Sequence, residues 1–351
     1  ANVGVGFSAL GANTTGGTNT AIGHEALDAN TTGANNAAMG YNSLGANTTG
    51  SSNVGIGLNA LLANTTADLV TAVGANAMAA NTTGVENVAF GASALATNTT
   101  GKFLTAIGYE ALHTHNTTNG GGVLSTAVGY KALKLETTGS GNTAVGGGTL
   151  DNLTTGEATT GVGVNALGAQ TTASNNVAVG YNAGDVITTS PSNTLLGHSA
   201  DPSSATSSGH EIAIGANATG KGTSTGFINP NGGGVFQGNN ASSWSQTSDR
   251  RIKKNIEDNT TGIDAINQIR IRNFEYRTED EITDFDNTKA AVVKKEGIQL
   301  GVIAQELETI FPEMVKTEST GVKTINPDNL TWYLVNAVKE LSAKVEELEN
   351  K

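Results

Sequence analysis

Histidines and carboxylates are the side chains in the first part of this sequence that could bind a metal ion or cleave a glycosidic bond. His113 and His115 lie two positions apart beside a glycine run, and imidazole nitrogens are common zinc ligands. No third ligand is apparent beside them, so we interpret the segment as a decorated loop and expect no metal site and no cofactor. The carboxylates recur at no fixed offset, so a paired-acid glycosidase stays open but unsupported. They are Glu25, Glu86, Glu110 and Glu157.

A short basic run near residue 250 could contact nucleic acid. It comprises Arg250, Arg251, Lys253 and Lys254, and it follows Ser248. Proteins that bind single strands interleave such charges with aromatic side chains, and a basic surface supplies most of the affinity. This run has no aromatics, and the whole chain carries a net charge of −12. We therefore expect no nucleic-acid partner; on composition alone the serine is a surface residue before a solvated basic run.

The density of charge divides the chain into two parts. Residues 1–247 hold four Lys, no Arg and eleven acidic residues, whereas residues 248–351 hold fifteen Lys or Arg and twenty acidic residues. This change predicts a domain boundary near Ser248. The chain has no cysteine, so neither a disulfide framework nor a thiolate metal site is expected. No apolar run approaches the ~18 residues of a membrane span, so we expect no membrane insertion.

A glycine recurs at intervals of 17 residues through the first part of the chain. Each of these anchor glycines precedes a small apolar tetrad, and only two intervals deviate, at 21 and 18 residues. A unit this short cannot bury a core alone, so each copy must stack on its neighbours. The anchors are Gly6, Gly23, Gly40, Gly57, Gly74, Gly91, Gly108, Gly129, Gly146, Gly163, Gly180, Gly197 and Gly215.

The residues around each anchor predict the path of one coil. Small and apolar side chains alternate before the anchor, as in Thr20–Gly23, and this pattern is typical of a strand. The Asn-Thr-Thr-Gly segments, such as Asn30–Gly33, combine residues that tolerate positive φ, so we interpret them as turns rather than glycosylation acceptors. We expect two short strands and a turn in each coil. Because so few large side chains would bury little apolar area in a lone chain, we expect a homotrimer to complete the core.

The repeat motifs also carry a resemblance. Asn19-Thr-Ala-Ile-Gly23 and Asn176-Val-Ala-Val-Gly180 resemble the head repeats of trimeric autotransporter adhesins and the related coils of phage tail fibres, which are parallel β-rolls. We therefore expect a mainly β protein with a 17-residue-repeat β-solenoid over residues 1–200. Residues 201–247, where the period dissolves into Ser, Thr, Gly and Asn, are expected to form a neck.

Four landmarks follow one another in the last 104 residues. They are Ser248–Lys253, Leu300–Leu307, Phe311–Val315 and a terminal amphipathic helix. With them, residues 248–351 closely resemble the autocleaving intramolecular chaperone domain at the C-terminus of phage tailspikes and tail fibres. The resemblance implies an α+β domain that directs trimerisation. One departure is Pro327, where the family more usually has an aromatic residue.

The same resemblance implies self-cleavage once the trimer has folded. When the family's cleavage residues are placed on this sequence, the cleaved bond is the one between Thr247 and Ser248. Ser248 would then be the nucleophile and Lys253 the general base. A hydroxyl becomes a good nucleophile when a base takes its proton, and a lysine serves as that base when burial or nearby cations lower its pKa. The neighbouring Arg and Lys residues supply like charge, whereas Asp249 opposes it. The chain would thus act once as a serine-lysine endopeptidase on itself, without turnover.

The end of the sequence predicts a coiled-coil helix that begins near Pro327 or Asp328. Apolar residues recur at spacings of three and four, which is typical of a seam between helices. Glu340 with Lys344, and Glu347 with Lys351, are expected to pair along its flanks. The seam continues to the last turns, so we expect a trimeric bundle to cover it. The seam residues are Leu330, Leu334, Ala337 or Val338, Leu341, Val345 and Leu348.

These features together predict the distal part of a phage tail fibre or tailspike. It would be a trimeric shaft or receptor-binding region on the virion, extracellular after release, that contacts a glycan or protein receptor on the host cell. The chain begins in repeat register and without Met, so we expect an upstream module that binds other tail proteins. Two alternatives stay open: a polysaccharide depolymerase tailspike, and a bacterial trimeric surface adhesin.

Overall fold

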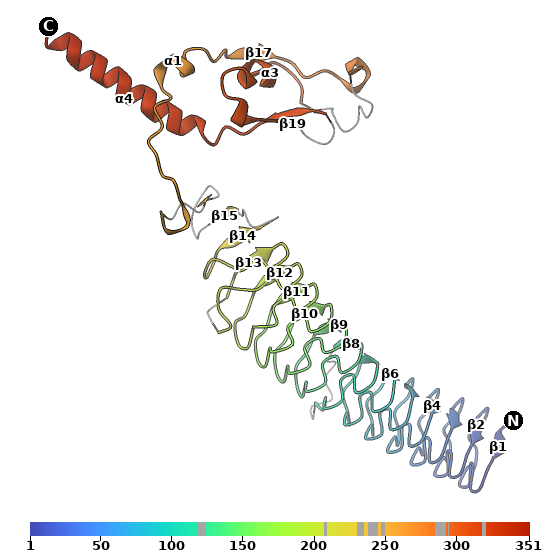
Figure 1. Cartoon of the computed structure of the whole chain (residues 1–351). Coiled ribbons are helices and arrows are strands. Elements are labelled where there is room, and N and C mark those ends of the chain that lie inside the picture. The colour runs from blue at the N-terminus through green and yellow to red at the C-terminus, as the bar shows by residue number, and fades with distance from the viewer. Residues whose placement is uncertain are drawn as a thin grey trace. The chain divides into compact units, whose positions relative to one another are not determined.

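The chain folds into two compact units, Ala1–Ser248 and Asp249–Lys351, each with its own set of elements (Figure 1). None of the helices in the part of the chain described here is long and apolar enough to cross a membrane. The structure is a computed structural model, and it describes residues 1–117, 124–206, 209–229, 235–237, 245–246, 250–284, 293, 295–317 and 321–351.

The first unit is a β-solenoid of about 13 turns, which confirms the fold expected from the 17-residue period. Each coil contributes one strand of three residues, and the strands stack in parallel one behind the next (Figure 1). Val3, for example, pairs with Thr20 one repeat later. The strands are β1 (Val3–Val5), β2 (Thr20–Ile22), β3 (Ala37–Met39), β4 (Val54–Ile56), β5 (Thr71–Val73), β6 (Val88–Phe90), β7 (Thr105–Ile107), β8 (Thr126–Val128), β9 (Thr143–Val145), β10 (Thr160–Val162), β11 (Val177–Val179), β12 (Thr194–Leu196), β13 (Ile212–Ile214) and β14 (Gly226–Ile228).

The parallel stack does not stop at residue 200. β13 and β14 continue it into the segment that we expected to be a neck. Two antiparallel strands, β15 (Val235–Gln237) and β16 (Ser245–Gln246), then complete the sheet. The regular pairing therefore outlasts the visible sequence period, because backbone hydrogen bonds do not require the side chains to repeat.

The expectation of two strands per coil was wrong. After the anchor glycine the chain turns instead of forming a second strand. In most coils φ is positive at the second and fourth following residues, such as Glu25 (57°) and Leu27 (53°). Positive φ is unfavourable for leucine. Its side chain is nevertheless fully buried in the coil, so burial offsets the backbone cost.

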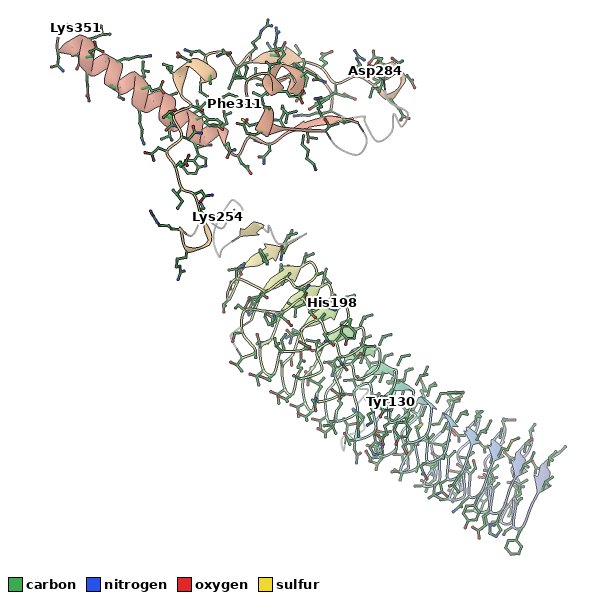
Figure 2. The ribbon with its side chains drawn as sticks, in the orientation of Figure 1. Tyr130, His198, Lys254, Asp284, Phe311 and Lys351 are labelled. Carbon is green, nitrogen blue, oxygen red and sulfur yellow. The ribbon has the colours of Figure 1, made fainter. Side chains whose placement is uncertain are left out.

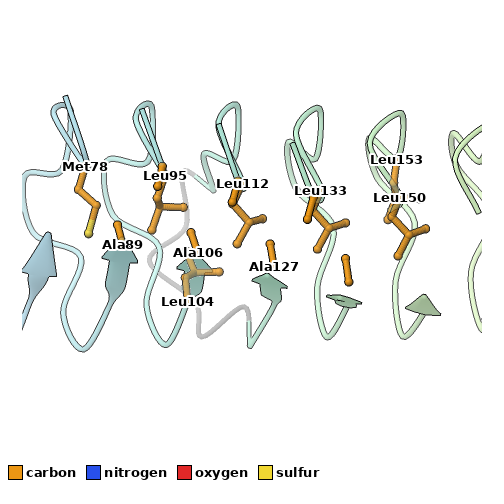
Figure 3. Packing of buried hydrophobic residues seen from close by; sticks show 14 of the residues in the cluster. Met78, Ala89, Leu95, Leu104, Ala106, Leu112, Ala127, Leu133, Leu150 and Leu153 are labelled. Carbon is orange, nitrogen blue, oxygen red and sulfur yellow. The ribbon is translucent and has the colours of Figure 1, made fainter. Parts of the chain in front are cut away.

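The core of the solenoid lies within one chain. In most strands the middle residue is small and points inward, as Ala106 does, and it belongs to the same core as a buried Leu or Met from the turn after an anchor, such as Leu112 (Figure 3). In β12 and β14 the middle residues are Leu195 and Phe227 instead. Ala106 and Leu112 are both fully buried. The argument that a lone coil buries too little, and needs a trimer to complete its core, is therefore wrong. A role for trimerisation has to rest on the outer surface instead.

The anchor glycines recur because no other residue fits there. Gly40 has φ +137°, and a Cβ at that position would lie 2.5 Å from the carbonyl oxygen of Gly57 in the next coil. The same clash with the following anchor's backbone recurs along the stack. The positive φ of each anchor is a conformation that mainly glycine adopts, and at the same position the backbone of the next coil comes too close for a side chain.

The asparagines of the Asn-Thr-Thr-Gly turns form a ladder inside the solenoid. Asn47 is fully buried, and its side-chain amide donates to Asn30 Oδ1 at 2.9 Å and to the carbonyl of Gly50 at 2.9 Å. Asn64 repeats the pattern one coil later by donating to Asn47 Oδ1. These side chains therefore satisfy buried backbone carbonyls, which explains the turns and leaves the asparagines inaccessible to glycosylation.

The second unit is a small α+β fold. Two hairpin-like pairs, β17 (Arg272–Phe274) with β18 (Gln299–Gly301) and β19 (Val315–Thr317) with β20 (Lys323–Ile325), are antiparallel. The core consists of Leu307, Phe311 and Met314, packed against apolar residues of the surrounding helices, strands and loops. The other elements are η1 (Arg250–Ile252), α1 (Ile263–Ile266), η2 (Glu279–Glu281), α3 (Ala304–Glu308), η3 (Pro312–Met314) and α4 (Leu330–Glu349).

Candidate functional site

The predicted cleavage site falls at the end of the first unit in sequence, directly before the second unit begins at Asp249. Thr247 and Ser248 lie outside the described residues, as does Asp249. The chain is described again from η1, and the backbone amide of Lys253 donates to the carbonyl of Arg250 at 3.1 Å, which fixes a tight turn directly before the lysine. The structure thus places the predicted base but not the predicted nucleophile.

The Lys253 side chain is exposed to solvent in the single chain. A lysine that acts as a base needs burial or crowding by other cations, as the sequence argument required. Arg250 and Lys254, on either side of it, are exposed too. A single chain therefore supplies neighbouring cations for Lys253 but no burial.

An apolar groove lies in the described part of the second unit. It has a volume of about 320 Å³ and is open on one side. The sequence argument missed it, because its walls come from four separate segments that meet only in the fold. Its apolar character could have been found from the isoleucines that recur at every third position before β17. The lining residues are Ile266, Ile269, Ile271, Val302, Leu307, Met314, Ile325, Pro327, Leu330 and Leu334.

The predicted seam on α4 is exposed. Leu330 and Leu334 line the groove at the start of the helix, while Leu341, Val345 and Leu348 have 51%, 44% and 69% of their surface open to solvent. The sequence therefore predicted the helix and its apolar stripe correctly, with a start at Leu330 instead of Pro327 or Asp328. Exposed leucines in a continuous row are the pattern of an interface between helices.

Ion pairs and hydrogen bonds hold the frame around the groove. The Arg272 guanidinium donates to both carboxylate oxygens of Glu306, at 3.1 and 2.6 Å, and this contact lowers the pKa of Glu306. A bidentate pair of this kind fixes the orientation of α3 against β17. The ring of Tyr333 stacks on Phe311 at 4.8 Å, and its hydroxyl donates to Glu313 at 2.7 Å (Phe311 is labelled in Figure 2). That hydrogen bond raises the pKa of Tyr333.

The two helical ion pairs predicted on α4 had different outcomes. Lys351 Nζ lies 2.7 Å from Glu347 Oε1, so this pair is confirmed. Glu340 instead accepts a hydrogen bond from the backbone amide of Ile263 at 3.0 Å and so joins α4 to α1. Sequence spacing could not predict this contact, because the partner lies 77 residues away.

The histidine pair in the solenoid lies in a different setting from the expected decorated loop. His115 is fully buried, and its Nδ1 lies 3.3 Å from Glu136 Oε2, which is fully buried as well. His113 instead places its Nδ1 3.1 Å from the carbonyl of Ser93. Both His115 and Glu136 stand seven residues after an anchor glycine, at the position of the asparagine ladder, so counting from the anchors could have paired them.

The described residues contain no group of three or more His, Cys, Asp or Glu side chains that could hold a metal ion. Asp185 and Asp201 are two carboxylates of the solenoid that influence each other electrostatically. Burial raises the pKa of Asp201 to about 6, and the nearby charge of Asp185 adds to this. A protonated Asp201 is therefore favoured in the folded chain well above its ordinary range.

This raised pKa predicts a pH-dependent stability. Asp201 binds its proton more tightly in the folded than in the unfolded chain. The stabilisation of the folded chain by this protonation is therefore fully present below about pH 4 and is lost as the pH rises through about 6. We expect the midpoint of urea unfolding to fall less between pH 4 and pH 7 in Asp201→Asn than in the wild type. Identical profiles for the two proteins would contradict the assignment.

The comparisons with known proteins point to the same domain as the sequence landmarks. The family model described as chaperone of endosialidase matches residues 248–316, which include the predicted Ser248–Lys253 motif, α3 and the first two residues of β19. No curated protein and no solved structure matches the chain. Together with the solenoid, the match fits a protein of the phage tail-fibre or tailspike kind. The chain therefore carries a phage-fibre chaperone domain of the endosialidase type behind its β-solenoid repeats.

Proposed function

We propose that this chain is the distal part of a phage tail fibre or tailspike, which its C-terminal domain assembles into a homotrimer before it cuts itself off. The family match at residues 248–316 carries the proposal. The match covers the predicted Ser248–Lys253 motif. Beyond the matched residues, the second unit ends in α4, a helix with an exposed apolar face. The fibre would belong to the virion and would meet the host cell from outside.

Two apolar surfaces support trimerisation. In the second unit the groove at Leu334 continues into the exposed seam of α4, and the described residues of this unit leave Leu341, Val345 and Leu348 open to solvent. In the solenoid, the third residue of many strands points outward and is exposed. The exposed members are Val5, Met39, Ile56, Phe90, Ile107, Val145, Val179, Leu196 and Ile228. Such long apolar rows mark surfaces that pack against other protein, and a second and a third copy carry matching rows.

The repeat itself explains why a separate assembly domain is useful. A shift of one chain against another by 17 residues would bring nearly identical coils together again, so the solenoids alone specify their register poorly. A globular trimer at the C-terminus would fix all three chains at one point. Cleavage afterwards would remove this domain and leave the shaft kinetically trapped.

The exposure of Lys253 is consistent with cleavage that waits for the trimer. The single chain leaves this side chain in solvent, whereas a base has to be partly desolvated to act. Contact with a neighbouring copy would supply that burial and would bring further cations. The proposal therefore makes Lys253 and Ser248 active only after assembly, which prevents premature cleavage.

A test of the trimer uses the Ser248→Ala background, so that the domain stays attached. Replacement of Leu341 and Leu348 by glutamine removes the apolar seam, and we expect the parent to run as a trimer and the double variant as a monomer or aggregate in light scattering at roughly 10 µM chain. Glu346→Gln, an exposed change on the same helix, is the matched control and should stay trimeric. A monomeric parent, or a trimeric double variant, would refute the proposal.

The two alternatives have their own tests. A depolymerase would release reducing ends from host polysaccharide, and no release across a panel of purified glycans would remove that activity. A bacterial surface adhesin would remain joined to a membrane anchor, so detection of the protein in purified phage particles would decide for the fibre.

A further inference from the structure

A row of side chains runs along one edge of the solenoid, made by the residue directly after each anchor glycine. We call it the edge row. Most of its large members are exposed, and aromatic members on adjacent coils stack, as Tyr109 and Tyr130 do with ring centroids 5.6 Å apart and an angle of 13°. Its members are Phe7, His24, Tyr41, Leu58, Ala75, Ala92, Tyr109, Tyr130, Gly147, Val164, Tyr181, His198 and Ala216.

The edge row is interrupted directly after Tyr130. Gly147 occupies the next coil, and a Cβ there would meet no atom closer than 3.9 Å, so the position is open. Gly148 follows, so this is the only anchor in the chain with two glycines after it. The following coil supplies Val164, 47% exposed. One aromatic face of the Tyr109–Tyr130 stack therefore borders a gap one coil wide.

Polar groups surround this gap. The Lys131 ammonium lies 4.9 Å from the ring centroid of Tyr130, and no carboxylate within ion-pair distance of it is found in the described part of the chain. A hydrogen bond with Tyr130 raises the pKa of Lys131, so the amine stays charged. The side-chain oxygen of Asn165 lies close to Gly148, 2.6 Å from the position that a Cβ on Gly148 would take. The gap thus offers a flat apolar face, a cation and an amide.

Contacts of Glu110 with Lys134 and with Tyr109 hold the Tyr109 end of the aromatic stack. Glu110 Oε2 lies 2.8 Å from Lys134 Nζ, and this contact lowers the pKa of Glu110. Glu110 accepts a hydrogen bond from Tyr109 in turn, which raises the pKa of that hydroxyl. Lys131 and Lys134 are two of only four cations in the first 247 residues. Both of them lie beside the Tyr109–Tyr130 stack, so this place combines aromatic rings with charged groups.

We propose that the gap at Gly147 binds one ring of a saccharide. The less polar face of the sugar stacks on Tyr130 at the spacing that the edge row already uses between rings. Lys131 donates to a hydroxyl or carboxylate of the sugar, and the Asn165 amide bonds a second hydroxyl. A few polar groups around an aromatic platform are the usual composition of a small-ligand site. The biological role of this site depends on the proposed function, in which the fibre contacts the host cell. Binding of the saccharide itself requires neither trimerisation nor cleavage.

The test is a titration of the full chain with defined oligosaccharides, followed by ligand-observed NMR: an oligoglucoside, an oligogalactoside and an oligouronate. We expect saturation transfer from at least one of them, with the uronate favoured if Lys131 reads a carboxylate. Tyr130→Ala and Lys131→Gln should each weaken binding by about tenfold or more. Gly147→Tyr should abolish it, because the new ring continues the stack and fills the gap where a Cβ is tolerated.

The control comes from the same row. Tyr181 stacks on His198 at 5.4 Å, far along the chain from the gap, so Tyr181→Ala removes an equivalent ring and should leave binding unchanged. Urea midpoints of all variants report whether they fold. Absence of binding to every probe, or binding that survives both Tyr130→Ala and Gly147→Tyr in folded protein, overturns the site. A monomeric or uncleaved protein that still binds would refute the proposed assembly and leave the site standing.

Discussion

Replacement of Gly40 by alanine is expected to destabilise the solenoid by about 3 kcal/mol or more. The new Cβ would have to accept φ +137° and would lie 2.5 Å from a backbone oxygen of the next coil, which no side-chain rotation can relieve. Backbone strain and overpacking therefore both lower the free energy of unfolding of this variant. Urea unfolding followed by far-UV circular dichroism measures the loss as a lower midpoint or as a separate early transition of the adjacent coils.

Gly17→Ala is the matched control for this prediction. Gly17 belongs to the same stack, but a Cβ there would meet nothing within 4 Å, and its φ is not positive. We expect a change within about 0.5 kcal/mol, or a slight gain from the reduced entropy of the unfolded chain. Equal losses for Gly17→Ala and Gly40→Ala would mean that the close approach of successive anchors does not determine the period.

The second large effect is expected at the proposed cleavage site. Ser248→Ala removes the nucleophile, and Lys253→Ala removes the base, so each should leave the chain at full length while trimers still form. Lys253→Arg is the sharper variant, because it keeps the charge but stays protonated and cannot take a proton. We expect its cleavage rate to fall by ~100-fold or more, in the range of a lost general base.

Denaturing gels after timed refolding measure these rates. Lys254→Ala is the control, since it removes a cation from the same exposed run without touching the proposed base. It should cleave within about a factor of ten of the wild type, with any deficit reporting the electrostatic support that the run gives to Lys253. Cleavage of Lys253→Arg at the wild-type rate would exclude Lys253 as the base.

The solenoid could be predicted from sequence to the extent that its geometry repeats. Anchors such as Gly40 showed the period, and alternation as in Thr20–Gly23 showed the strand, because both follow from the backbone of one coil. The second strand was mispredicted because the tetrad after the anchor looks apolar enough for a strand. The structure uses leucines with positive φ there, a conformation that sequence statistics disfavour.

Features that depend on contacts between distant residues could not be predicted. The burial of Asn47 is an example: the turn was predicted, but the interior ladder was not, because an asparagine usually lies at the surface. The contact of Glu340 with Ile263 and the apolar groove likewise require the folded second unit. The pairing of Ser248 with Lys253 stays a prediction, since only the lysine belongs to the described residues.

The division of labour between the two units is the central claim. We propose that the self-similar shaft supplies stability within each chain, and that the C-terminal domain supplies the register between chains and is then removed by cleavage. The anchors, the asparagine ladder and the single-chain core account for the first part. The family match and the exposed seam support the second.

The intact mass of the freshly assembled wild-type protein, measured under denaturing conditions, tests this claim most directly. The account predicts two polypeptides, one that ends at Thr247 and one that begins at Ser248, with no full-length chain left once trimers have formed. A single full-length mass in protein shown to be trimeric, or a cut at any other bond, would contradict it.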